Sequence, residues 1–187
     1  MEYESARHVT SLNGKDWPFP WPDVFEQQSL HRYTRHHESG TAQVDFLIAD
    51  HVAPRILAQL PEPTPVQAPG GSNALQRTQK FEVIDVNGTS RISSPDLPGA
   101  LVLKIEVYAA DSRDRERHLR DAVTLAALLN EDTWGSPLHG QGISRMRRLI
   151  TWLNDSHRIG RAGIPADDAS NAIFALEDLL EAQSDRS

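Results

Sequence analysis

The sequence predicts an α+β protein, in which a small and largely antiparallel sheet of two hairpins packs against helices from the C-terminal half. Two observations lead to this prediction. In the first half, apolar and polar residues alternate with period two, in segments that turn residues separate. In the second half, apolar residues recur at three- and four-residue steps, which is typical of amphipathic helices. We expect a sheet lobe with an extended N-terminal arm over residues 1–95 and a helical lobe over residues 96–187, packed as one compact unit.

The composition excludes several classes of protein. The 187 residues suit one domain, and 39% hydrophobic with 24% charged residues indicates a globular chain. The net charge of −7 argues against broad nonspecific binding to nucleic acids. Because cysteine is absent, disulfides, thiolate catalysis and Cys-type zinc sites are excluded, which fits a cytoplasmic protein. No apolar run approaches the roughly 20 residues of a membrane helix and no signal peptide opens the chain, so we expect no membrane partner.

The first predicted hairpin contains a carboxylate in an unusual place. Residues 30–37 form one strand, residues 38–40 the turn, and Thr41–Ala49 the second strand, whose alternate positions are apolar: Val44, Phe46 and Ile48. Asp45 lies within this otherwise apolar strand, where a carboxylate is costly without a partner or a metal ion. The residues leave two interpretations open, a functional carboxylate or an edge-strand carboxylate that faces water.

Two further features near the N-terminus have a plain and a functional interpretation. Trp17, Phe19 and Trp21 alternate among prolines in an extended arm, which either packs over apolar surface or binds a partner. His36 and His37 are adjacent, so in a strand they point to opposite faces and cannot easily bind one metal ion. We expect them to be surface histidines.

The second predicted hairpin is marked by its turn. Phe81–Val86 and Thr89–Ser93 flank Asn87-Gly88, a pair that suits the positive φ angles of a type I′ turn. A proline-rich stretch over residues 61–69 precedes this hairpin and is predicted to be an extended surface loop.

The stretch Gly99–Asn130 is the most informative part of the chain. Its first part, residues 101–107, alternates with period two as in a strand, but it also reads as a buried helix with Asp96 as its N-cap. Its second part predicts an amphipathic helix whose polar face carries Arg113, Arg117, Arg120 and Asp121. Arg117 and Asp121 are one turn apart and can pair.

Two more amphipathic helices are predicted near the C-terminus. The first covers residues 143–153, with its arginines mostly outward: Arg145, Arg147 and Arg148. The second begins near Ile164-Pro165, with acidic residues favourably placed in its first turn.

Lys104, the run RDRERHLRD and the alanine–leucine segment after it resemble the C-terminal half of nucleotidyltransferase-like proteins of the AbiEii/AbiGii toxin type. That family has a lysine-bearing helix, then an arginine and a helix with a (K/R)-D-x-x-D-like element. Here the element reads Arg117-His118-Leu119-Arg120-Asp121, with His118 at the first acidic position. The hairpin of the family is matched by two further segments: His31-Arg32-Tyr33 and Val44-Asp45-Phe46-Leu47.

The resemblance implies a fold like the catalytic core of DNA polymerase β and transfer of a nucleotidyl group with Mg²⁺. It implies that Asp45 is a catalytic, metal-binding carboxylate and that Lys104 is a catalytic residue facing the triphosphate of an NTP. The implied substrate-binding residues are Arg113, Arg117 and Asp121, and the arginines supply the cations that phosphate oxygens require.

Two parts of the family's pattern are missing. The glycine motif and the paired aspartates of Asp-x-Asp should precede His31, and residues 1–30 hold neither. Gly70-Gly71-Ser72 with Asp85-Val86-Asn87 matches them only loosely and follows Asp45 in the chain, so we interpret this match as accidental. We therefore expect an N-terminally incomplete, truncated or degenerate nucleotidyltransferase.

The alternative belongs to a different class, a noncatalytic module of a toxin–antitoxin type system that binds RNA or an antitoxin protein. Its contacts would come from the aromatic arm and the arginine face. For Lys104 the plain interpretation is a lysine whose ammonium group reaches water from a buried element, and for the arginines it is a solvated helix face.

Overall fold

In the computed structural model, the chain forms two compact units, Met1–Phe46 and Leu47–Ser187. The structure describes residues 11–12, 15–16, 26–29, 32–37, 40–45, 47–59, 66–86 and 88–184. The aromatic arm, most of the proline-rich loop and Asn87 lie outside the described residues. Both strands and helices are present, which confirms the α+β class. The predicted division at residue 95 runs inside the second unit, where strands and helices occur together.

The first unit contains short antiparallel strands. These are β1 (Ser11–Leu12), β2 (Lys15–Asp16), β3 (Glu26–Ser29), β4 (Arg32–His37) and β5 (Gly40–Asp45). The predicted first hairpin is confirmed as β4 and β5, in register from His37 opposite Gly40 to Arg32 opposite Asp45. The second strand ends at Asp45 and does not continue to Ala49.

The second unit begins with β6 (Ile48–Ala49), which pairs in parallel with β7 (Gln67–Ala68). The two residues at positions 48 and 49 therefore leave the first hairpin, because their backbone groups bond to a segment almost twenty residues later. Two short helices, α1 (Pro54–Leu57) and α2 (Gly71–Gln76), complete this part of the chain.

The second predicted hairpin is confirmed as β8 (Thr78–Asp85) and β9 (Gly88–Pro95). Its register is continuous from Thr78 opposite Pro95 to Asp85 opposite Gly88, so Gly88 begins β9 and does not lie inside the turn. Among the described strands, this hairpin forms a sheet of its own, and β3, β4 and β5 form another. The sequence had led us to expect a single sheet.

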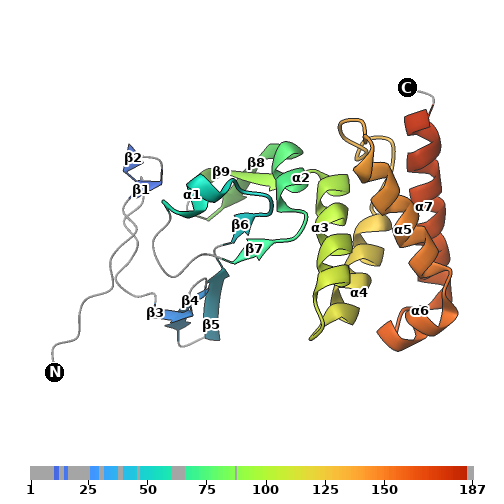
Figure 1. Ribbon diagram of the computed structural model, residues 1–187, viewed down its shortest axis with the longest axis horizontal. Coiled ribbons are helices and arrows are strands. Elements are labelled where there is room, and N and C mark those ends of the chain that lie inside the picture. Colours follow the sequence, from blue (N-terminus) through green and yellow to red (C-terminus); the bar gives the residue numbers. More distant parts are fainter. Residues whose placement is uncertain are drawn as a thin grey trace. The chain divides into compact units, whose positions relative to one another are not determined.

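Five helices follow, and they form the core of the second unit. They are α3 (Leu97–Ala110), α4 (Arg115–Ala126), α5 (Gln141–Leu153), α6 (Ser156–Ala162) and α7 (Ala166–Ser184). Helices α3 and α4 pack side by side, and α7 packs against α4 and α5 (Figure 1). The fully buried side chains come from several helices and include Leu101, Ile105, Leu119, Met146, Leu149 and Leu176. Within the described ranges, no helix has both the length and the apolar character to cross a bilayer.

The helical interpretation of residues 101–107 is the right one. The side chains of Leu101, Val102, Ile105 and Tyr108 are all buried, at steps of one, three and three residues. A helix buried over this wide an arc is apolar on more than one side, so its sequence loses the narrow stripe that marks an amphipathic helix. The alternation with period two was therefore not evidence of a strand.

A buried ion pair joins the hairpin to the helices. The carboxylate of Asp96 accepts hydrogen bonds from the backbone N–H of Gly99 (2.8 Å) and from Nε of Arg77 (2.8 Å), and Nη2 of Arg77 lies 2.7 Å from its other oxygen. Asp96 is 4% exposed and Arg77 12%. The guanidinium also donates to backbone carbonyls of the loop before α5, which are those of Trp134, Ser136 and Pro137.

We predict that Asp96→Ala lowers the free energy of unfolding by about 3–5 kcal/mol, because it leaves the buried Arg77 guanidinium without its counterion and removes the N-cap of α3. Urea unfolding followed by circular dichroism measures the change. The matched control is Arg161→Ala, which breaks an exposed pair with Glu116 and should cost about 0–1 kcal/mol. Equal losses in the two variants would contradict the central role of Asp96.

Candidate functional site

Two of the predicted site residues meet across α3 and α4. The Nζ atom of Lys104 lies 2.6 Å from Oδ2 of Asp121, and the two side chains are 32% and 34% exposed. The expected pair between Arg117 and Asp121 is not formed, because the packing of α3 against α4 brings the Lys104 ammonium group to the carboxylate instead. Lys104 is therefore half-buried and held by a counterion.

Arg113 and Arg117 lie near this pair in sequence, at the connection from α3 to α4 and in the first turns of α4. Both are exposed. The backbone N–H of Arg113 donates to Oδ1 of Asp111 (2.8 Å), which fixes the backbone at this point. In the part of the chain that the structure describes, neither guanidinium lies within ion-pair distance of a carboxylate.

Asp45 belongs to the first unit, whereas Lys104 belongs to the second. Asp45 is exposed at the end of β5, directly opposite Arg32 in the ladder. Over the described residues, no three His, Asp or Glu side chains gather closely enough to hold a metal ion. The metal-binding role of Asp45 stays a prediction from the resemblance.

Glu106 is a partly buried charge centre that the sequence did not reveal. Its Oε1 accepts from Nε of Arg145 (2.7 Å) and also from Nη2 of Arg148. Burial raises the pKa of Glu106, but the two guanidinium groups outweigh it and hold this pKa below its ordinary value. The expectation that Arg145 points outward is wrong, since its side chain is only 13% exposed. No signal in the sequence relates residues about forty positions apart.

Asp50 is a second carboxylate that the sequence analysis missed. Its two oxygens accept from the backbone N–H groups of Gly70 (2.7 Å) and Ser72 (2.8 Å), at the start of α2. Burial raises the pKa of Asp50, but these N–H groups lower it more, so the net direction is below the ordinary value. A side chain on Gly71 would meet the Cα of Ala49 at 2.9 Å, so the chain passes too closely for any other residue.

The Gly70-Gly71-Ser72 segment therefore does not offer its N–H groups to a phosphate. In a phosphate-binding loop such groups face the oxygens of the ligand. Here they bind the carboxylate of Asp50, and the hydroxyl of Ser72 donates to the backbone carbonyl of Asp50. The likeness to a nucleotidyltransferase glycine motif is local in sequence only.

Arginines and aromatic rings form a cluster where α3, α4, α5 and α6 meet. The rings of Tyr108 and Trp152 pack edge to face, with centroids 4.7 Å apart. The guanidinium of Arg115 lies 4.6 Å from the Tyr108 centroid, and that of Arg148 lies 5.1 Å from the Trp152 centroid. Arg158 donates to the hydroxyl of Tyr108 (3.0 Å). These contacts attach α6 and the start of α4 to the core.

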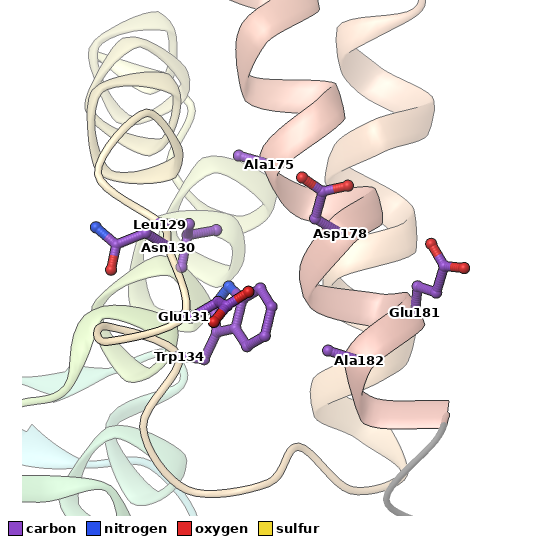
Figure 2. A pocket seen from close by; sticks show the side chains of 8 residues that line it. All are labelled: Leu129, Asn130, Glu131, Trp134, Ala175, Asp178, Glu181 and Ala182. Carbon is purple, nitrogen blue, oxygen red and sulfur yellow. The ribbon is translucent and has the colours of Figure 1, made fainter.

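A pocket of about 530 Å³ lies between α7 and the loop that follows α4 (Figure 2). Trp134 and Leu129 line one side, and small residues of α7 line the other. Three carboxylates also line it: Glu131, Asp178 and Glu181. Because they would repel phosphate groups, this pocket is unsuited to a nucleotide.

No family model, curated protein or solved structure matches this chain. The resemblance to nucleotidyltransferases is therefore a prediction from motifs alone. The Lys104–Asp121 pair, with the exposed arginines beside it in sequence, is the candidate site that we carry forward.

We predict that Glu106→Gln destabilises the protein by about 2 kcal/mol at neutral pH, because two guanidinium groups lose their shared counterion. The folded pKa of Glu106 is lowered, so its contribution is fully present above the ordinary value of 4.5 and is lost as pH falls through the folded value. The variant should therefore show a flatter dependence of unfolding free energy on pH in this acid range. Urea unfolding at a series of pH values measures it.

The control is Glu177→Gln, which removes an exposed carboxylate on α7. It should leave the pH dependence unchanged. If the unfolding free energy of Glu106→Gln varied with pH as that of the unmodified chain does, the pKa of Glu106 would not differ between the folded and unfolded states. That result would contradict the prediction.

Proposed function

We propose that this chain is a cytoplasmic, nucleotidyltransferase-like protein related to the AbiEii/AbiGii toxins, whose helical part binds the phosphates of an NTP beside Lys104. The observation that carries the proposal is the contact between Lys104 and Asp121 (2.6 Å). The resemblance assigns both residues to one site, although they are seventeen positions apart and lie on different helices. Their contact supports the resemblance without depending on it.

The chemistry of the site suits a polyphosphate in part. The ammonium group of Lys104 has three donors and uses one on Asp121. Because about a third of the side chain is exposed, the other donors can reach phosphate oxygens. The ion pair with Asp121 orients the ammonium group. Arg113 and Arg117 supply exposed guanidinium groups that match phosphate geometry in two-point contacts.

The Mg²⁺ implied by the resemblance fits less well. Two-metal transfer needs paired carboxylates, and the described residues present Asp45 alone at an implied position. The proposal therefore concerns NTP binding beside Lys104. Whether nucleotidyl transfer follows is a separate outcome of the experiment below.

The second candidate is a noncatalytic module that binds RNA or an antitoxin protein. It is favoured by the exposure of Arg113 and Arg117, whereas Lys104 already has a counterion. Phosphate-backbone contacts need exposed cations of this kind, and they do not require a nucleotide pocket.

We predict that isothermal titration of the full chain with each of the four NTPs gives binding that is stronger with Mg²⁺ and is lost in Lys104→Ala. The matched control is Lys80→Ala, because Lys80 is the other lysine of the second unit and lies on the exposed hairpin. It should bind as the unmodified chain does.

A transfer assay with labelled NTP then separates binding from catalysis. If titration with every NTP releases no heat, and circular dichroism shows that the chain is folded, the nucleotide proposal is wrong. Retained binding of a labelled RNA that weakens in Arg113→Ala and Arg117→Ala would then favour the noncatalytic module.

A further inference from the structure

Among the strands that the structure describes, β8 is a regular edge strand. Its eight residues pair with β9 in continuous register, with no bulge and no proline in β8. Every residue from Thr78 to Ile84 is exposed. Among the described strands, β9 is the only partner of β8.

Such an edge is a template for another strand. In an antiparallel ladder, alternate residues turn their N–H and C=O groups toward the neighbouring strand, so half of the groups of β8 point away from β9. Proteins usually block an open edge with a bulge, a proline or a covering segment. The described part of β8 contains neither a bulge nor a proline, and its side chains from Thr78 to Ile84 are exposed.

The charges on β8 fit a second copy of the same strand. In the segment Lys80-Phe81-Glu82, a cation and a carboxylate flank an aromatic residue. We propose that two copies of this chain associate through β8, antiparallel and about a two-fold axis at Phe81. Lys80 of each copy then lies opposite the partner's Glu82, and the two hairpins form one four-stranded sheet.

The neighbouring symmetric registers are unfavourable. An axis at Lys80 places two ammonium groups opposite each other, and an axis at Glu82 places two carboxylates opposite each other. The register centred on Phe81 is the one that joins unlike charges at both positions. Glu82 also has Arg91 beside it in its own hairpin, at 3.1 Å, so each carboxylate would lie between two cations.

The same register joins the apolar faces of the two hairpins. Phe81, Val83 and Ile92 share one face of the hairpin, since Phe81 is opposite Ile92 and side chains alternate along a strand. They are 42%, 41% and 49% exposed. A two-fold axis perpendicular to the sheet keeps this face on one side, so Phe81 contacts the partner's Phe81 as a cross-strand aromatic pair.

The absence of cysteine from the chain permits a direct test by crosslinking. Under mild oxidation, full-length Phe81→Cys should form a covalent dimer, because residues on the axis bring their Cβ atoms within disulfide reach. The matched control is Ile92→Cys, which lies opposite Phe81 on the same face with similar exposure but one strand further from the axis. It should stay monomeric on a nonreducing gel.

Charge reversal provides the second test, by sedimentation equilibrium of the full chain. Lys80→Glu and Glu82→Lys should each raise the dimer dissociation constant about tenfold or more, because each places like charges opposite each other twice. An equal mixture of the two variants should associate again as a heterodimer, since unlike charges then meet at both positions. Arg147→Glu on α5 is the control and should not change the constant.

Several results would overturn the proposal. These are a monomeric unmodified chain at every concentration reached, equal crosslinking of Phe81→Cys and Ile92→Cys, or a mixture of the two charge variants that stays monomeric. Because the mixture restores association between two altered chains, a positive result cannot come from misfolding.

Discussion

The second unit depends most on the buried pair between Asp96 and Arg77. Asp96 caps α3, and its backbone N–H also donates to the carbonyl of Arg77 (2.8 Å), which follows α2. Gly135 lies against the carboxylate so closely that a Cβ atom there would collide with it. A charge this deeply buried is stable only with its counterion and hydrogen bonds in place. One interaction therefore fixes the hairpin, the first turn of α3 and the loop before α5 relative to one another.

Helix α3 is buried on several sides yet holds two ionic residues. Lys104 reaches Asp121 on α4, and Glu106 reaches Arg145 and Arg148 on α5. Each charge is neutralised by a different neighbouring helix, so the two pairs fix α4 and α5 against α3. The same arrangement leaves one-third of Lys104 exposed, which is what a phosphate-binding lysine requires.

The surface outside the helices suggests a different kind of interaction. The β8–β9 hairpin exposes apolar residues, and β9 is the one described partner of β8, whereas three carboxylates line the pocket beside α7. The two proposals therefore concern separate surfaces: the cationic residues near the α3–α4 connection for an anionic ligand, and the edge of β8 for a second copy of the chain.

The sequence by itself determined the two hairpins and the beginning of α3. The alternating segments predicted both hairpins, and Asp96, with Pro98 after it, offered the N-cap that α3 uses, because turns and caps depend on neighbouring residues. The sequence analysis missed α6, because the seven residues between its N-cap Asp155 and its C-cap Gly163 are too few to show a helical period. It also misjudged the strand through Ala49, since pairing with Gln67–Ala68 is not a local property.

Only the tertiary structure decided which charges meet. The sequence paired Arg117 with Asp121, one helical turn away, but the packing of α3 on α4 gave Asp121 to Lys104. The sequence predicted that Arg145 faces solvent, but the side chain is largely buried and forms an ion pair with Glu106. Both differences have one physical cause. An exposed pair on a single helix contributes only a few tenths of a kcal/mol, about 0.3–0.5, whereas a half-buried pair between helices satisfies charges that would otherwise be costly.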